Sequence, residues 1–165
     1  MKRAFLLVLI VCIGVSGCGH RTPAQPLTSC FSAHLTVTDG DTVYDGQLTV
    51  GEHTYEWALT APPSVAGYRL CCDGTQISLV SDEGEALTAA MGKLPADGIP
   101  MVLWCGLFDS DRDPPTVQDG IGLSQGDTPV GRYRLFTDAK SGAPLSLEPL
   151  TAAWVAVFDE CTFYG

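Results

Sequence analysis

Basic side chains are scarce in this 165-residue chain, which has nine Lys and Arg residues against 19 Asp and Glu residues. The formal net charge is −10, and the few basic residues are not clustered along the sequence. Proteins that bind nucleic-acid phosphates or anionic lipid headgroups need concentrated positive charge. The composition therefore excludes nucleic acid and anionic headgroups as partners.

The chain also has no apolar run long enough to cross a bilayer. The N-terminal run, Ala4–Val15, has 12 residues, whereas a hydrocarbon core of ~30 Å requires about 20. The run follows Met1-Lys2-Arg3 and ends in small residues, which is the pattern of a secretory signal. We expect residues 1–17 to be removed, which leaves seven basic side chains and a net charge near −12.

The end of this segment, Val15-Ser16-Gly17-Cys18, resembles the lipobox of bacterial lipoproteins, with Val15 where leucine is more usual. The resemblance implies cleavage before Cys18, a diacylglycerol on the Cys18 sulfur and often a fatty acid such as palmitate on the new amino group. Two acyl chains suffice for stable anchoring. We therefore expect a lipid-anchored protein on the extracytoplasmic face of a bacterial membrane, with the inner and the outer membrane both open if the cell has two.

Residues 19–29 are polar and Pro-rich without hydrophobic periodicity, so residues 18–29 are interpreted as the lipidated cysteine and a flexible tether. Residues 30–165 are enough for one domain with its own core. Five cysteines remain in it, so at least one thiol is unpaired in a monomer. Either all five are free, or a disulfide forms, and Cys30–Cys161 is then the preferred pair because it ties the first strand to the last residues.

Alternation of apolar and polar residues predicts antiparallel strands in the first half of the domain. Apolar residues at i, i+3, i+4 and i+7 predict one short helix, Pro100–Phe108. The segment Leu87–Met91 fits either a short helix or an irregular strand. Residues 109–119 are expected to form a polar loop. Strands return after Gly131, and the last of them, Ala152–Phe158, is apolar on both sides and is expected to be covered on both faces.

This order of elements resembles the LolA-like lipoprotein carriers and their lipid-anchored relatives, the LolB and LppX groups. The similarity lies in the opening F-x-A strand, the Pro-containing break at 61–67, the apolar helix and the closing hairpin in GRYRLFTDAKSGAPLSLEP. The resemblance implies a mainly β (α+β) fold, in which a curved antiparallel sheet forms a half-barrel with one or two short helices over its concave face. It also implies an apolar cavity between sheet and helices. Two departures are the missing N-terminal amphipathic helix and the short domain.

Catalytic and metal-binding motifs are nearly absent. Gly122-Leu123-Ser124-Gln125-Gly126 matches G-x-S-x-G, but a nucleophile elbow needs a following helix and a downstream histidine, and all three histidines lie upstream. The acidic segment 109–113 starts like a calcium loop, but Pro114 stands where glycine is needed and Gly120 where glutamate should bind. His34 and His53 are interpreted as ordinary strand residues. We expect no enzyme, no cofactor and no metal site.

The remaining candidate site is apolar, and its residues occupy inward positions of the predicted strands and helix. These candidate ligand-binding residues are Phe31, Leu35, Trp57, Leu59, Leu70, Leu79, Trp104, Phe108, Trp154 and Phe158. In one hypothesis they hold an acyl chain, a lipid or a lipoprotein anchor. In the alternative they only pack a core, and the protein is a non-catalytic surface adaptor that docks an extracellular or cell-wall partner protein. A cavity below about 300 Å³, or one filled by the protein's own side chains, favours the adaptor.

Overall fold

The computed structural model describes residues 27, 30–129 and 131–164. The predicted signal peptide, Cys18 and most of the tether lie outside the described residues. The elements, in chain order, are β1 (Phe31–Asp39), β2 (Thr42–Val50), β3 (Tyr55–Ala61), β4 (Tyr68–Cys72), β5 (Gln76–Ser81), β6 (Ala86–Ala90), the 3-10 turn η1 (Met91–Lys93), α2 (Ile99–Phe108), β7 (Thr116–Gln118), β8 (Ile121–Thr128), β9 (Gly131–Asp138), β10 (Pro144–Pro149) and β11 (Trp154–Phe163).

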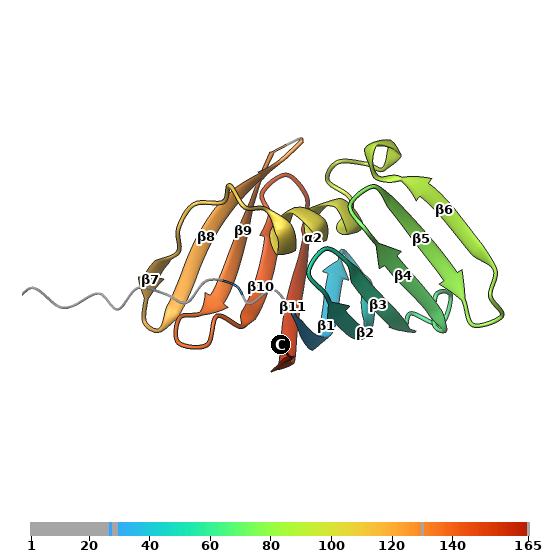
Figure 1. Cartoon of the computed structure of the whole chain (residues 1–165), viewed down its shortest axis with the longest axis horizontal. Helices are drawn as coiled ribbons and strands as arrows, with labels where there is room; N and C mark the ends of the chain where they lie inside the picture. Colours follow the sequence, from blue (N-terminus) through green and yellow to red (C-terminus); the bar gives the residue numbers. More distant parts are fainter. Residues whose placement is uncertain (1–26, 28–29, 130, 165) are drawn as a thin grey trace, which may run out of the picture.

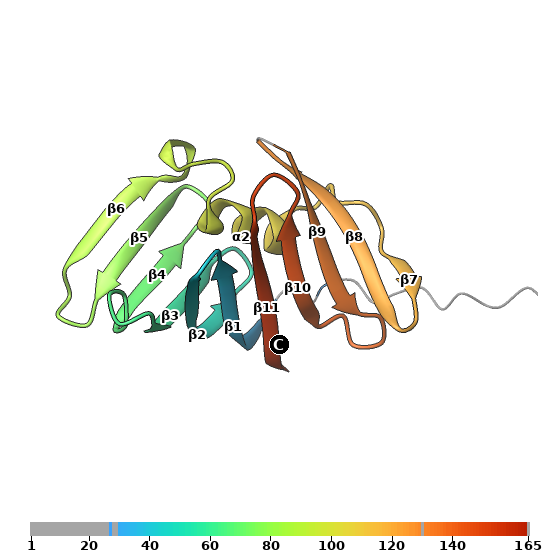
Figure 2. The same cartoon turned by 180° about the vertical axis from the view of Figure 1, so that it is seen from behind.

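The strands form one eleven-stranded antiparallel sheet that does not close on itself. Its order is β6-β5-β4-β3-β2-β1-β11-β10-β9-β8-β7, so each half of the chain is a meander and the halves join where β1 pairs with β11. The sheet curves around α2, which connects the two meanders (Figures 1 and 2). This confirms the predicted fold class, a mainly β fold with a curved antiparallel sheet and a short helix across it.

Alternation along the strands gives the sheet two different faces. Along β1, Phe31, Ala33, Leu35 and Val37 are fully buried, and the residues between them are only partly covered. We call the buried side the covered face, because α2 packs on it through Val102, Leu103 and Leu107. The other side, which carries Ser32, His34 and Thr36 of β1, is the open face.

Several local expectations need correction. The segment 87–91 is strand β6 for most of its length, followed by η1. Part of the expected 109–119 loop is strand β7, and the G-x-S-x-G segment lies within strand β8, with Ser124 buried, so it is not a nucleophile elbow. The last strand is covered on one face only, because Val157 is 38% exposed on the open face.

All five described cysteines of the domain are free thiols, so the Cys30–Cys161 disulfide is not formed. Strand register explains its absence. Tyr164 donates its backbone N–H to the carbonyl of Cys30, so Cys30 lies opposite residue 164 rather than residue 161. Three residues of strand correspond to about 10 Å, whereas a disulfide needs Cα atoms less than about 7 Å apart. The Cys161 thiol instead donates to the Pro144 carbonyl at 3.6 Å.

Candidate functional site

The ten predicted ligand-binding residues do lie on one side of the sheet, but most are inaccessible. Six of them are buried on the covered face beneath α2 or beside it. They are Phe31, Leu35, Trp57, Leu59, Trp154 and Phe158, each at most 7% exposed. The other four, Leu70, Leu79, Trp104 and Phe108, are partly buried against the same core. The covered face is therefore filled largely by the protein's own side chains.

Helix α2 contributes an aromatic pair to this packing. The rings of Trp104 and Phe108 lie 4.3 Å apart between centroids, one helical turn from each other. Trp104 also lies against the β4–β5 turn, where a Cβ on Gly74 would overlap its indole ring. Gly74 has φ of +84°, which favours glycine. The pair is therefore held between the helix and a turn that leaves room for it.

A mostly apolar hollow opens on the covered face beside the strands at one edge of the sheet. We call it the edge hollow, and its volume is about 240 Å³. It is lined by Leu70, Ile77, Leu79, Leu87, Thr88, Ala89, Leu94 and Pro100. Ligand pockets for drug-sized molecules have volumes of about 300–1,000 Å³. Of the ten predicted residues, only Leu70 and Leu79 line this hollow, which is too small to enclose a lipid.

The open face carries a row of mostly apolar side chains, interrupted by Ser146, that was not predicted from the sequence. The strand register aligns Leu123 with Phe136, Phe136 with Ser146, and Ser146 with Val157 across four neighbouring strands. We call these four residues, together with exposed Ile121, the open-face row. Around Ile121, Leu123 and Phe136 the surface is hollowed, with a volume of about 270 Å³. Within each strand, apolar and polar residues alternate as in any half-buried strand. The row becomes visible only when segments that are distant in sequence are paired in the sheet.

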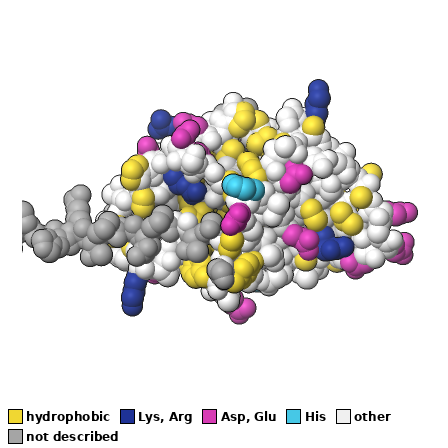
Figure 3. All heavy atoms as spheres, in the orientation of Figure 1, with side chains coloured by type: hydrophobic (Ala, Val, Ile, Leu, Met, Phe, Trp, Pro, Cys, Tyr) yellow, Lys and Arg dark blue, Asp and Glu magenta, His cyan; other side chains and the backbone are white. Residues whose placement is uncertain are grey.

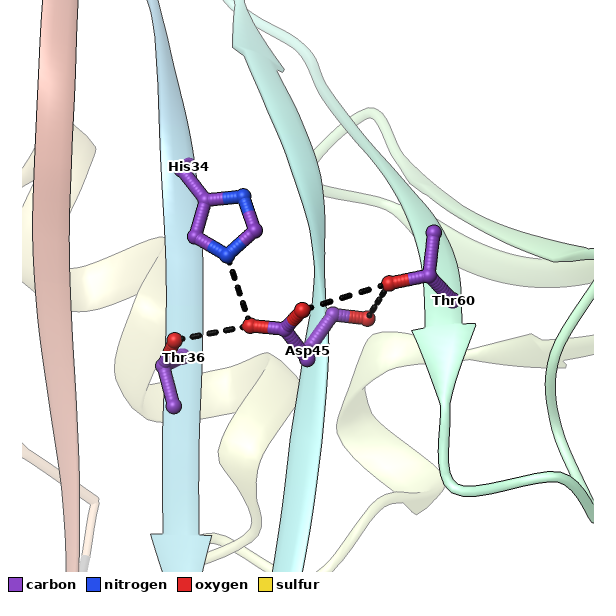
Figure 4. A network of polar contacts seen from close by, with 4 residues as sticks. All are labelled: His34, Thr36, Asp45 and Thr60. Carbon is purple, nitrogen blue, oxygen red and sulfur yellow. Dashed lines mark hydrogen bonds and ion pairs between the residues drawn. The ribbon is translucent and has the colours of Figure 1, made fainter.

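The open-face row continues into a polar network on β1, β2 and β3 (Figure 4). The Nε2 atom of His34 lies 2.7 Å from Oδ1 of Asp45, and Thr36 donates to the same oxygen at 2.8 Å. Thr60 donates to Oδ2 of Asp45 at 3.3 Å. Burial alone would raise the pKa of the Asp45 carboxyl, but the hydrogen bonds from Thr36, His34 and Thr60 outweigh it and hold that pKa below 3.8.

This network does not have the arrangement of a catalytic triad. In a triad the nucleophile hydroxyl is hydrogen-bonded to the histidine, which takes its proton. Here both threonine hydroxyls donate to the carboxylate of Asp45 instead. The cluster is a partly exposed hydrogen-bonding surface, since the side chains of His34 and Asp45 are 40% and 29% exposed.

A hollow of about 400 Å³ lies at the ends of β2 to β5 and has a mixed lining that includes Thr49, Glu56, Cys71, Asp73 and Tyr164. Burial, and then the neighbouring Glu56 carboxylate, raises the pKa of the Cys71 thiol. A raised pKa keeps the thiol protonated and unreactive. Among the described residues, no group of three or more His, Cys, Asp or Glu residues is arranged to hold a metal ion.

The surface charge matches the composition. Lys and Arg side chains are scattered singly over the face in Figure 3 and do not form a patch. Within the part of the chain that the structure describes, no helix is long and apolar enough to cross a membrane.

Comparisons with known proteins identify similar folds rather than a function. The chain matches no protein-family model, and a search of curated proteins gave no significant match. An uncharacterized conserved protein from Thermus thermophilus is similar in structure, with a TM-score of 0.50 and 8% identity over 84% of this chain and 81% of that one. This likeness concerns the fold alone.

Two further structures resemble the chain more loosely. A LolA superfamily protein from Nitrosomonas europaea gives a TM-score of 0.44 and 10% identity over 86% of this chain and 89% of that one. A chain from the complex of the CwlD amidase with the GerS lipoprotein of Clostridioides difficile gives 0.41 and 11% identity over 99% and 93%. The structural neighbours thus include a LolA superfamily protein.

Proposed function

We propose that this protein is a lipid-anchored, extracytoplasmic adaptor that docks a partner protein on the open face of its sheet and has no catalytic activity of its own. The observation that carries the proposal is the contrast between the two faces. The covered face is filled largely by α2 and the core, and two hollows that open on it, the edge hollow and one beside Ser124, Leu135 and Thr137 of β8 and β9, have volumes of about 240 Å³ each. The open face has no covering element in the described residues and presents the open-face row.

The chemistry of the open face is that of a protein interface. Interface cores combine aromatic and aliphatic side chains, and polar groups that supply hydrogen bonds surround them. Phe136 and Leu123 are partly buried, and Ile121 and Val157 are 43% and 38% exposed. The His34–Asp45 network adds directional polar groups beside them. The scarcity of basic residues favours a partner with a neutral or basic surface.

Membrane attachment completes the proposal. Acyl chains on Cys18 hold the protein at the membrane, and the tether lets the domain reach a partner in the cell envelope. Eleven residues, Gly19–Ser29, span on the order of 35 Å when fully extended. A partner docked on the open face is thereby kept close to the membrane surface.

The test is photo-crosslinking in living cells from positions on the open face and away from it. A photoreactive amino acid at Val157 should give a discrete adduct with another protein, while one at exposed Lys140, in the β9–β10 turn, should not. Replacing Ile121 by Asp should remove the Val157 adduct without changing the amount of folded protein. Absence of any adduct from Val157, or an equal adduct from Lys140, would reject docking on the open face.

A second candidate, binding of a hydrophobic ligand, is favoured by one observation, the apolar lining of the edge hollow by Leu70, Ile77, Leu79 and Leu87. In this hypothesis an acyl chain lies along the hollow with its remainder in solvent. Saturable binding of a fluorescent fatty acid at micromolar concentration, weakened by Leu87→Asp and unaffected by Ile121→Asp, would support it. Absence of saturable binding would leave the adaptor as the only candidate.

A further inference from the structure

Strand β6 is an edge strand that lacks the usual protection against pairing with another chain. It ends the sheet, and in the described residues it pairs only with β5. Its sequence, ALTAA, contains no charge, no proline and no bulge. Natural edge strands are usually protected by charges, proline, bulges or short length. The opposite edge, β7, has three residues and follows Pro114-Pro115, so it is protected in the ordinary way.

The unpaired backbone groups of β6 can be assigned from its register with β5. The carbonyl of Glu85 accepts from the N–H of Ser81, and the N–H of Met91 donates to the carbonyl of Thr75. Odd-numbered residues of β6 therefore direct their backbone groups at β5. By the alternation of antiparallel ladders, the N–H and C=O groups of Ala86, Thr88 and Ala90 point outward from the sheet.

We propose that a second copy of this chain pairs with β6 in antiparallel orientation, about a two-fold axis through Thr88. In this register Thr88 lies opposite Thr88 of the second copy, and Ala86 lies opposite Ala90. In this register, the outward-pointing backbone groups of Ala86, Thr88 and Ala90 all face outward-pointing backbone groups of the second copy. The interface is isologous, as expected for a symmetric dimer.

Side-chain size and charge fit the same register. On the covered face, each Leu87, which is 76% exposed, lies opposite the small Ala89 of the other copy. Beyond the ends of the strands, the acidic β5–β6 turn with Glu83 and Glu85 is directed toward exposed Lys93 of the other copy. Opposite charges on facing segments stabilise the antiparallel pairing. A parallel arrangement would instead place the two acidic turns next to each other and the two Lys93 side chains next to each other.

The dimer also changes the edge hollow. Leu87, Thr88 and Ala89 form its outer wall. Pairing along β6 puts the hollows of the two copies side by side on the same face and covers the exposed Leu87 side chains. The open face stays free, so this inference does not depend on the proposed docking there.

The register predicts a specific crosslink. Residues directly opposite each other in a hydrogen-bonded antiparallel pair have Cα atoms about 5.5 Å apart, which lies within the range of a disulfide. The full-length Thr88→Cys protein in cell membranes should therefore form a reducible dimer on mild oxidation. The wild type and Lys140→Cys, an exposed turn position, should not form it. A dimer of equal yield in either control, or no dimer from Thr88→Cys, would overturn the proposal.

A proline substitution tests the pairing without relying on cysteine chemistry. The N–H of Thr88 points out of the sheet, so Thr88→Pro removes no backbone hydrogen bond to β5, although it removes the exposed side-chain hydrogen bond between Thr88 and Ser78 at 3.0 Å. It blocks pairing at the two-fold axis. Thr88→Lys, which places a charge on the edge, is the second variant in case the proline variant does not fold. The detergent-purified wild type should sediment as a dimer, and the folded variants as monomers. A monomeric wild type at micromolar concentration, or dimers that persist in the folded variants, would contradict the inference.

Discussion

Two buried tryptophans on the covered face differ in whether their indole N–H has a partner. Trp154 donates to the carbonyl of Asp97 at 3.1 Å, whereas the Nε1 atom of Trp57 is the one buried side-chain N or O atom among the described residues without a hydrogen bond. Both residues are at most 5% exposed. An unsatisfied buried donor is destabilising, and a hydrogen bond contributes about 1 kcal/mol net.

We therefore expect Trp154→Phe to lower the free energy of unfolding by about 1 kcal/mol more than Trp57→Phe does, since both lose similar packing but only one loses a hydrogen bond. Urea denaturation of the two variants measures the difference. Equal losses, or a larger loss for Trp57→Phe, would mean that the Trp57 indole has a partner in solution.

Asp73 stabilises the β4–β5 turn through three hydrogen bonds, from the backbone N–H groups of Thr75 and Gln76 and from the Thr75 hydroxyl. These bonds, led by the one from the Gln76 backbone, lower the pKa of Asp73 from 3.8 to about 2. A pKa that is lower in the folded state contributes stability above the unfolded-state value, and this stability is lost as pH falls through the folded-state value.

The wild type should therefore lose stability as pH falls from about 4 to about 2, and Asp73→Asn should lose less over that interval. The Asn amide oxygen still accepts the same hydrogen bonds but carries no charge. Urea denaturation at several pH values in this range measures the slopes. Asp138→Asn, which alters a similar turn carboxylate with a lowered pKa, should reduce the slope in the same direction. Identical slopes for wild type and Asp73→Asn would contradict the assignment.

At the scale of elements, the covered face should respond to charge differently at its centre and at its edge. Leu59 in β3 is 7% exposed, and Leu87 in β6 is 76% exposed, although both point to the same side of the sheet. Leu59→Glu places a carboxylate in the core and should cost several kcal/mol or unfold the domain. Leu87→Glu, compared in the monomeric Thr88→Lys background because the proposed dimer covers Leu87, should leave the circular dichroism spectrum and the unfolding midpoint nearly unchanged. A well-folded Leu59→Glu protein would indicate that water reaches the covered face and that it forms an open cavity.

Most of the sheet could be predicted from the sequence, because half-buried antiparallel strands alternate in polarity. Helix α2 begins at Ile99, one residue before the predicted start. Strand β8 was missed because two of its covered-face positions are Gly122 and Gly126 rather than large apolar residues. Tyr133 of β9 explains one of them, since a Cβ on Gly126 would overlap its hydroxyl. The Tyr133 side chain, which comes from the neighbouring strand β9, fills the space beside Gly126. The sequence of β8 alone could not indicate this.

The candidate site was less predictable, because it too depends on how segments that are distant in sequence pack together. The sequence identified the inward apolar positions, but it could not indicate that the protein's own helix and core would fill the space between them. The open-face row and the His34–Asp45 contact depend on which strands are neighbours. In particular, β1 pairs with β11 across more than a hundred residues of chain. The His34–Asp45 pair lies on adjacent strands β1 and β2, but it needs the diagonal contact that this register produces.

For the whole molecule, we expect membrane attachment to depend on a lipid anchor at Cys18. Cys18→Ala should release the protein from the membrane fraction, because the described residues include no helix that could cross a membrane and basic residues are few and not clustered in the sequence. Fractionation followed by immunoblotting measures this, and the mass of the released protein distinguishes it from uncleaved precursor. A processed Cys18→Ala protein that still sediments with membranes would show that something other than acyl chains anchors it.

The proposal that this chain docks a partner and carries no ligand on its covered face can be tested on the purified protein. Native mass spectrometry of the full-length protein, purified from membranes under gentle conditions, tests it most directly. We expect the mass of the processed chain with its covalent acyl chains, singly or as a dimer, and no further noncovalent adduct. A stoichiometric lipid or fatty-acid adduct, lost in a folded Leu79→Glu variant, would contradict it and establish the protein as a carrier.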